Sequence, residues 1–294
     1  MTEVVQYAVQ ALSLGGLYAL FALGVALVFG VGGIVNFAHG QLIVLSMYMV
    51  VATDALPWPL TVLAALLTAV VLGVAMETFV FRPARGADES TYLIISFALA
   101  LAIQALVLMI IGATAKSTSF GQSLARAVHF GSVQVPAVDL VTLGVAVLSL
   151  GGLVYLLRGT RLGVRLRAAA EDFEMARLVG VKANGVMSAT FALGGLLAGI
   201  AAVLLCASGG VVTPESGLQP LLIAFVATVI GGMGSLGGAA IGGGLLGVLT
   251  IVLQVVLPQS IRSYRDAFVF ALVIALLYFR PAGLAGTLRK QERV

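Results

Sequence analysis

The stretch GGLYALFALGVALVFGVGGIVNFAHGQ, residues 15–41, decides the fold class of this protein. It contains no Asp, Glu, Lys or Arg, and apolar residues predominate as far as Phe29. A transmembrane helix needs about 20 mainly apolar residues in succession. Residues 5–29 therefore predict a membrane-spanning helix. The glycines and polar side chains that follow predict that the helix is broken there, because irregular backbone at membrane depth must line a cavity or be buried in protein.

The whole chain shares this composition. Of its 294 residues, 61% are hydrophobic and 10% are charged, and the mean hydropathy is +1.13. Soluble domains carry about 25% charged residues. The 36 glycines are spread through the apolar runs, where small residues let helix backbones approach closely in lipid. These features predict an all-α polytopic membrane protein, with residues 1–294 forming a single transmembrane domain.

Hydropathy and length divide the chain into eight to nine transmembrane segments, nine if every segment crosses. The full-length candidates are 5–29, 60–81, 91–111, 139–157, 186–207 and 239–257. The shorter or interrupted candidates, which either cross or are re-entrant, are 34–53, 218–231 and 264–279. The long connection 112–138 is polar and mixed, so we expect it outside the membrane with a short surface helix.

Lys and Arg are distributed unevenly among the loops. Twelve of the 16 lie within 82–85, 158–182 and 280–293, which nine crossings place on one face. The other four fall on the opposite face: Lys116, Arg126, Arg262 and Arg265. Loops rich in Lys and Arg stay in the cytoplasm, so we predict the N-terminus outside and the C-terminus in the cytoplasm. The positive charge thus reflects topology and does not indicate a nucleic-acid partner.

Groups for catalysis or metal binding are scarce. The only histidines are His39 and His129, and the second falls in a predicted external loop, so no metal site is expected. The sequence shows no Ser/His/Asp set, no HExxH motif and no pair of buried acids, which argues against an intramembrane enzyme. Cys206 is the only cysteine, so no disulfide framework is available.

The broken segment after Phe29 carries polar side chains where a helix would otherwise continue. Polar residues at membrane depth usually face the protein interior or a solute pathway. We predict a substrate pathway here, formed by Asn36, Phe37, His39, Gly40 and Gln41, with Gln104 from the fourth segment. In the alternative interpretation, these polar groups only hydrogen-bond free backbone ends and hold helices together.

The glycine-rich segment Gly232-x-Gly234-x-x-Gly237 has the spacing of a dinucleotide-binding loop. Its context does not fit, because it lies between apolar spans and no acidic residue follows about 20 positions later. We predict a tight cytoplasmic hairpin here, with close helix packing at Gly232, Gly234, Gly237, Gly238 and Gly242.

The cytoplasmic loop 158–185 contains a helix-prone stretch, residues 166–179. Its apolar residues recur at helical spacing, its charged residues occupy the other side, and Gly180 is a natural C-terminal stop. A helix lying on lipid headgroups is one interpretation, but anionic headgroups repel the three acidic residues of this stretch. We favour a helix that docks into a groove of a cytoplasmic protein. Glu174, Ala176 and Gly180 have the E-x-A-x-x-x-G spacing of the coupling helix of ABC permeases.

Together, three stretches resemble the permease subunits of Liv-type, branched-chain amino acid ABC transporters. They are residues 15–41, RAAAEDFEMARLVGV at 167–181 and FVATVIGGMGSLGGAAIGGGLLG at 225–247. The NFAHG string near the N-terminus is similar to the shorter of the two related permeases in such systems. Val35 and the AAAED spelling are mild departures from the family's usual strings.

The resemblance implies a permease in a bacterial inner membrane that imports branched-chain amino acids or a similar small amphipathic solute, such as urea, an amide or an aromatic acid. It implies three kinds of partner: a second related permease in a heterodimer (a homodimer stays open), two ATP-binding subunits and an external solute-binding protein. ATP and Mg are bound by the ATP-binding subunits, and no cofactor is bound by this chain. The residues expected to contact the ATPase are Glu171, Asp172, Glu174, Ala176, Arg177 and Gly180.

A secondary carrier or channel that works alone is the alternative function. An ion-coupled carrier normally has acidic or basic residues deep in its spans. Residues 183–261 contain a single charge, Glu215, near an external loop. This scarcity favours the ATP-driven importer.

The charge distribution yields a topology prediction that cysteine labelling tests. In a background where Cys206 is replaced, a cysteine introduced at Lys116 should react with an impermeant thiol reagent in intact cells, because this loop is external. A cysteine introduced at Arg161 should not react, because its loop is cytoplasmic. Labelling at 161 but not at 116 would overturn the orientation.

Overall fold

The computed structural model describes residues 2–130, 133–280 and 283–284. Its longer helices are α1 (Thr2–Gly32), α2 (His39–Ala52), α3 (Trp58–Met76), α4 (Glu89–Ile111), α5 (Ala137–Gly159), α8 (Ala183–Gly209), α9 (Leu218–Gly231), α10 (Leu236–Val256) and α11 (Arg265–Phe279). The shorter ones are η1 (Glu77–Phe81), η2 (Gln122–Ala125), α6 (Arg161–Glu171), α7 (Phe173–Leu178) and η3 (Arg262–Tyr264).

Six helical segments among the described residues are long and apolar enough to cross a membrane, and α2 and α9 are shorter apolar helices. The predicted all-α polytopic fold is therefore confirmed at this level. The number of crossings and the orientation stay predictions. The predicted cytoplasmic C-terminus and its basic residues beyond Arg280 lie outside the described residues.

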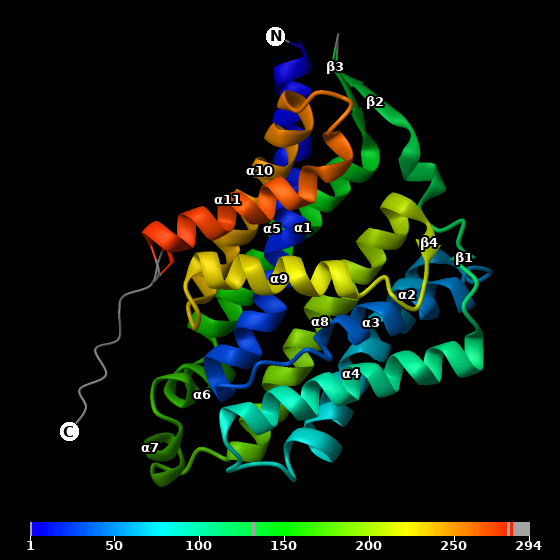
Figure 1. Cartoon of the computed structure of the whole chain (residues 1–294). Helices are drawn as coiled ribbons and strands as arrows, with labels where there is room; N and C mark the ends of the chain where they lie inside the picture. The colour runs from blue at the N-terminus through cyan, green and yellow to red at the C-terminus, as the bar shows by residue number, and fades with distance from the viewer. Residues whose placement is uncertain (1, 131–132, 281–282, 285–294) are drawn as a thin grey trace.

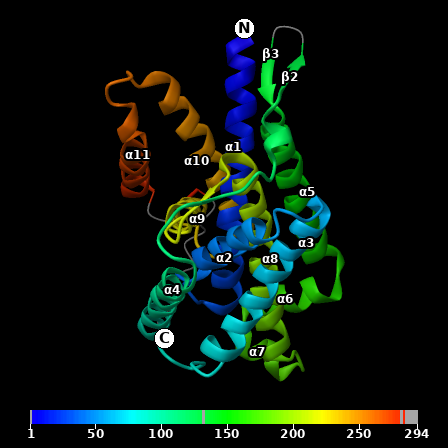
Figure 2. The ribbon, with the colours of Figure 1, turned by 90° about the vertical axis from the view of Figure 1, so that its right-hand side faces the viewer.

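Helix α1 forms the centre of the molecule. It runs through the middle of the bundle, with α5, α8, α9 and α10 packed around it (Figure 1). Leu20, Ala22 and Ala26 are fully buried. In two perpendicular views the β2–β3 hairpin lies at one end of the molecule and α6 and α7 at the other (Figure 1, Figure 2). The core thus sits between these two ends.

Close packing of α1 against α10 depends on glycine. A Cβ added at Gly247 would overlap the backbone of Gly15, and one added at Gly243 would overlap Ala19. A Cβ added at Gly15 would come within 3.0 Å of the Gly244 carbonyl oxygen. Helices approach this closely only where no side chain separates their backbones.

The first helix continues further than its glycines predict. Gly30 and Gly32 remain inside α1, and the break begins at Gly33, whose φ of +63° is unfavourable for other residues. Glycine within an apolar helix is tolerated when neighbouring helices bury it, so only the positive φ marks the break.

The long connection between α4 and α5 contains strands as well as a short helix. It holds one short helix, the 3₁₀ helix η2, and parts of two small antiparallel sheets. In one sheet β1 (Lys116–Ser117) pairs with β4 (Val211–Val212), and in the other β2 (Ala127–Phe130) pairs with β3 (Val133–Pro136). Pairing between β1 and β4 draws the segments after α4 and α8 together.

Asp54, in the loop between α2 and α3, holds the same connection in place. Its Oδ1 accepts a hydrogen bond from the Thr118 hydroxyl at 2.7 Å, and its Oδ2 accepts from the Ser119 amide and hydroxyl, both at 2.9 Å. These bonds, led by that from the Ser119 amide, lower the pKa of Asp54 below its usual value. Their contribution to stability is therefore present at neutral pH and is lost as the pH falls through that lowered pKa.

The glycine contacts of α10 predict a sharp difference between two neighbouring positions. Gly247→Ala should lower the melting temperature, because overpacking of a tight contact costs about 1–3 kcal/mol. Gly244→Ala is the matched control on the same helix, since an added Cβ there meets no atom within 4 Å. Thermal unfolding of the two variants in detergent measures the difference. Equal melting temperatures would contradict the proposed close contact.

Candidate translocation and coupling site

Residues 33–38 join α1 to α2, and Asn36 organises this break. The Asn36 Oδ1 accepts a hydrogen bond from the Ala38 amide at 2.9 Å, which satisfies one free donor at the start of α2. Its Nδ2 has no hydrogen-bond partner within the described structure, although the residue is only 3% exposed. One half of the Asn36 amide therefore serves the helix break, and the other half is available to a ligand or water.

His39 begins α2 and is buried between α1 and α8. A Cβ added at Gly24 would come within 2.5 Å of the His39 Nε2, and one added at Gly194 within 3.8 Å of its Cε1. Two glycines therefore create the space that the imidazole occupies. Nε2 has no hydrogen-bond partner among the described residues. The side chain faces the protein interior and not lipid.

Unpartnered polar atoms are concentrated around this segment. Five buried side-chain atoms in the described part of the chain have no hydrogen-bond partner: Asn36 Nδ2, His39 Nε2, Gln41 Oε1, Ser46 Oγ and Tyr48 OH. All five belong to residues 36–48. Buried polar groups are normally satisfied, so such a concentration needs an explanation, such as water or a ligand.

The remaining predicted pathway residues lie at different depths. Phe37 is half-buried. Its ring stacks on Phe225 of α9, with 6.0 Å between the ring centroids, and packs edge to face with Phe97 of α4, with 6.3 Å between the centroids. Gly40 packs against α9, where an added Cβ would lie 2.6 Å from the Gly217 oxygen. Gln104 is half-buried on α4 and does not line the large cavity described next.

A cavity of about 1120 Å³ lies at the end of the molecule that holds α6 and α7. Its walls come from residues 29–34, 85–86 and 233–235, together with Tyr92, Ala169, Ala170, Phe173, Glu174, Arg177, Ala183, Asn184 and Met187. All three sequence stretches of the predicted family motif thus contribute to one cavity, although they are far apart in the chain. The five unpartnered polar residues are not among those that line it.

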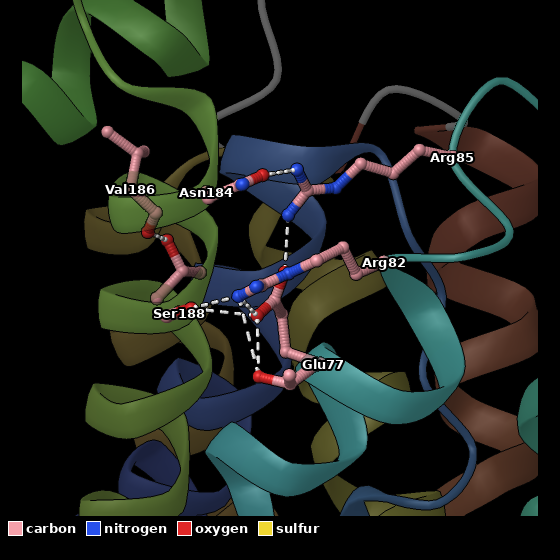
Figure 3. Close-up of polar contacts among 8 residues, drawn as sticks. Glu77, Arg82, Arg85, Asn184, Val186 and Ser188 are labelled. Atoms are coloured by element: carbon pink, nitrogen blue, oxygen red, sulfur yellow. Dashed lines mark hydrogen bonds and ion pairs between the residues drawn. The ribbon is translucent and has the colours of Figure 1, made fainter.

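Glu77 links η1 to α8 (Figure 3), and its partner Arg85 lines this cavity. Glu77 is fully buried, its Oε2 lies 2.7 Å from the Arg82 Nη2, and its Oε1 pairs with Arg85. The Ser188 hydroxyl of α8 donates to the Glu77 Oε2 at 2.7 Å, and Arg85 also donates to the Asn184 side chain. The sequence around Glu77 carries no signal for Ser188 or Asn184, which lie about a hundred residues away.

The predicted continuous helix at 166–179 is wrong, because the structure divides it into α6 and α7 at Asp172. The Asp172 carboxylate accepts a hydrogen bond from the Met175 amide at 2.9 Å and so caps the start of α7. Asp residues compete with the helical backbone in this way, which explains why a break replaces a continuous helix.

Gly180 ends α7 as the sequence predicts. It has a φ of +90°, its amide donates to the Arg177 oxygen, and the Val181 amide donates to the Ala176 oxygen. This is the Schellman arrangement that glycine favours.

The surface of α7 and its end is mixed in character. Ala176 is buried, but Glu174 and Arg177 are exposed, as are the apolar Met175, Leu178 and Val179. Glu171 and Asp172 are exposed as well. Exposed apolar and charged side chains on one short helix suit a contact with another protein.

The glycine-rich turn separates α9 from α10. Gly232 and Gly234 have positive φ values of +99° and +90°, which explains the need for glycine at both. Gly238 and Gly242 pack against α9, where a Cβ added at Gly242 would overlap the Ala227 oxygen. A Cβ added at Gly237 meets no atom within 4 Å, so this glycine does not contribute to the close packing.

The described residues contain no group of three His, Cys, Asp or Glu side chains that could hold a metal ion. What the arrangement provides is a polar, glycine-broken segment, a cavity and an exposed short helix, all connected to one bundle.

Comparisons with known proteins agree with the sequence motifs. The family model "Branched-chain amino acid transport system / permease component" matches residues 7–277. The permease BraD of Pseudomonas aeruginosa is 33% identical over 97% of this chain and 98% of its own, and LivH of Escherichia coli is 32% identical over the same shares. Both are named high-affinity branched-chain amino acid transport permeases. No solved structure matches this chain. The chain therefore belongs to the family of permease components of branched-chain amino acid transport systems.

Proposed function

We propose that this permease imports branched-chain amino acids, or a similar small amphipathic solute, across a bacterial inner membrane. The observation that carries the proposal is the family match over residues 7–277, with relatives named for this solute class. The chain crosses the membrane nine times, with its N-terminus outside and its C-terminus in the cytoplasm. The end of the molecule that holds α6 and α7 then faces the cytoplasm.

The complete importer contains this chain, a second related permease, two ATP-binding subunits and an external solute-binding protein. The solute-binding protein delivers the solute to the outer face of the permease pair. ATP and Mg, held by the ATP-binding subunits, supply the energy. The exposed helix α7 is the contact that transmits their closure to the transmembrane helices. The exposure of Met175 and Leu178 beside Glu174 supports this role.

The pathway for the solute runs beside residues 36–41. A small solute with a charged end and an apolar end needs a mostly apolar surface with a few polar points. Buried, unpartnered polar atoms on Asn36, His39 and Gln41 support this assignment, because a passing solute or its water can satisfy them. Phe37, between Phe97 and Phe225, offers apolar contact nearby.

The coupling role of α7 predicts the effect of two substitutions. Gly180→Leu places a side chain at a φ of +90° and should distort the end of α7, and Glu174→Lys reverses an exposed charge there. Both should lower ATP-driven leucine uptake and the amount of ATPase that co-purifies, while membrane insertion stays normal. Glu89→Lys is the matched control, since Glu89 is an exposed acid at the start of α4. Unchanged uptake with normal co-purification would remove the coupling assignment.

The pathway assignment predicts that transport and stability respond differently. Asn36→Leu or His39→Leu should lower uptake at least about fivefold, the equivalent of one hydrogen bond of about 1 kcal/mol, with a smaller loss of assembly. Thr190→Val is the control: Thr190 is buried on α8, and its hydroxyl bonds the Val186 carbonyl oxygen within its own helix. Uptake and melting temperature are measured on the same reconstituted complex. If uptake falls only in proportion to assembly, these residues hold the helix break and do not line a pathway.

A further inference from the structure

The charged residues that line the 1120 Å³ cavity are Arg85, Glu174 and Arg177. Arg85 comes from the segment after η1, whereas Glu174 and Arg177 come from α7. Among the described residues, neither Glu174 nor Arg177 forms an ion pair. The cavity therefore brings two guanidinium groups from separate segments to one space, with one carboxylate beside them.

Behind this wall, one carboxylate serves two guanidinium groups. Glu77 pairs with both Arg82 and Arg85, so the cluster keeps one excess positive charge. Arg85 donates one hydrogen bond from Nη1 to Asn184 and one from Nη2 to Glu77. A guanidinium has five N–H donors, so three donors of Arg85 remain for other partners. Glu77 and Asn184 also fix the guanidinium in place, which makes it a preorganised anion receptor.

The rest of the cavity wall combines polar residues, among them Tyr92, Asn184 and Ser235, with large apolar side chains. Phe29, Ile34, Phe173, Met187 and Met233 line it. Ligand sites combine such walls with a few placed polar groups, and an arginine selects a planar carboxylate through paired N–H donors. The combination fits a small carboxylate with an aliphatic body.

We propose that this cavity is an exit-side binding site for the carboxylate of an aliphatic amino acid, held by Arg85 with Arg177. The inference rests on the proposed function for the identity of the solute and for the cytoplasmic side of the cavity. It places a second solute contact at α7 itself, separate from the pathway residues 36–41. A solute bound there touches both the coupling helix and the Glu77 cluster.

Equilibrium binding to the membrane complex, which contains both permeases and both ATP-binding subunits, tests the proposal. The complex is held in lipid nanodiscs, without nucleotide and without the solute-binding protein, and radiolabelled leucine is the probe. Isocaproate keeps the carboxylate and the aliphatic body of leucine, whereas leucinol lacks the carboxylate. Leucine should bind and be displaced by isocaproate but not by leucinol. Displacement by leucinol as effective as that by isocaproate would overturn the carboxylate site.

Substitutions then locate the site. Arg85→Gln should weaken leucine binding about tenfold or more, as expected for a lost charge-assisted hydrogen bond. Arg177→Gln, which leaves the Glu77 cluster intact, should weaken it in the same direction. Arg161→Gln, an exposed arginine of α6 outside the cavity, should leave it unchanged. Wild-type affinity in Arg85→Gln would overturn the proposal.

A double variant separates binding from folding. Arg85→Gln combined with Glu77→Gln removes a charge of each sign, so the buried carboxylate is not left with a single partner. This double variant should still bind leucine weakly. If it regains wild-type affinity, Arg85 acts only through the fold, and the site is wrong.

Leucine uptake into proteoliposomes, measured beside the binding assay, distinguishes this proposal from the proposed function. If the wild-type complex with its solute-binding protein takes up leucine, but leucine binding does not depend on Arg85, the exit site is wrong and the proposed function stands. If isocaproate binding depends on Arg85 but the complex does not take up leucine, the proposed solute is wrong and the carboxylate site stands.

Discussion

The structure depends on one constraint: the backbone of residues 33–38 leaves helical geometry and must be kept away from lipid. Unpaired backbone groups cost several kcal/mol each in a hydrocarbon environment. The chain meets this constraint by placing the break inside the bundle, capped by Asn36 and enclosed by α8 and α9. Glycines at 24, 194 and 217 let the neighbouring helices approach closely enough to enclose it. The break supplies Asn36 and Phe37 to the proposed pathway, and Gly33 and Ile34 to the wall of the cavity.

Interactions that are local in the sequence could be predicted. The lengths of the apolar runs predicted the long helices, the NFAHG string predicted the break after α1, and Gly180 predicted the end of α7. The prediction of a continuous helix failed at Asp172, where two local signals compete. Helical periodicity predicted continuity there, whereas the carboxylate captured the Met175 amide and started a new helix.

Long-range partners could not be predicted in the same way. The residues next to Glu77 in the sequence do not indicate Ser188 or Asn184 as members of its hydrogen-bond network. Those next to Phe37 do not indicate Phe97 or Phe225 as its ring contacts. Those contacts follow from helix packing, which a hydropathy pattern does not encode. The convergence of three distant motifs on one cavity is likewise a property of the fold.

The contact between α1 and α10 has a consequence for biosynthesis. Gly15 lies in the first helix to leave the ribosome, but its partner Gly247 belongs to one of the last. Until α10 arrives, the glycine face of α1 must be covered by lipid or by the insertion machinery. Because α1 carries no charge after Glu3, it remains stable in the bilayer during that interval. The polar side chains at the start of α2 are not stabilised by the bilayer in this way. We therefore expect late, concerted closure of the bundle around α1 to complete membrane assembly.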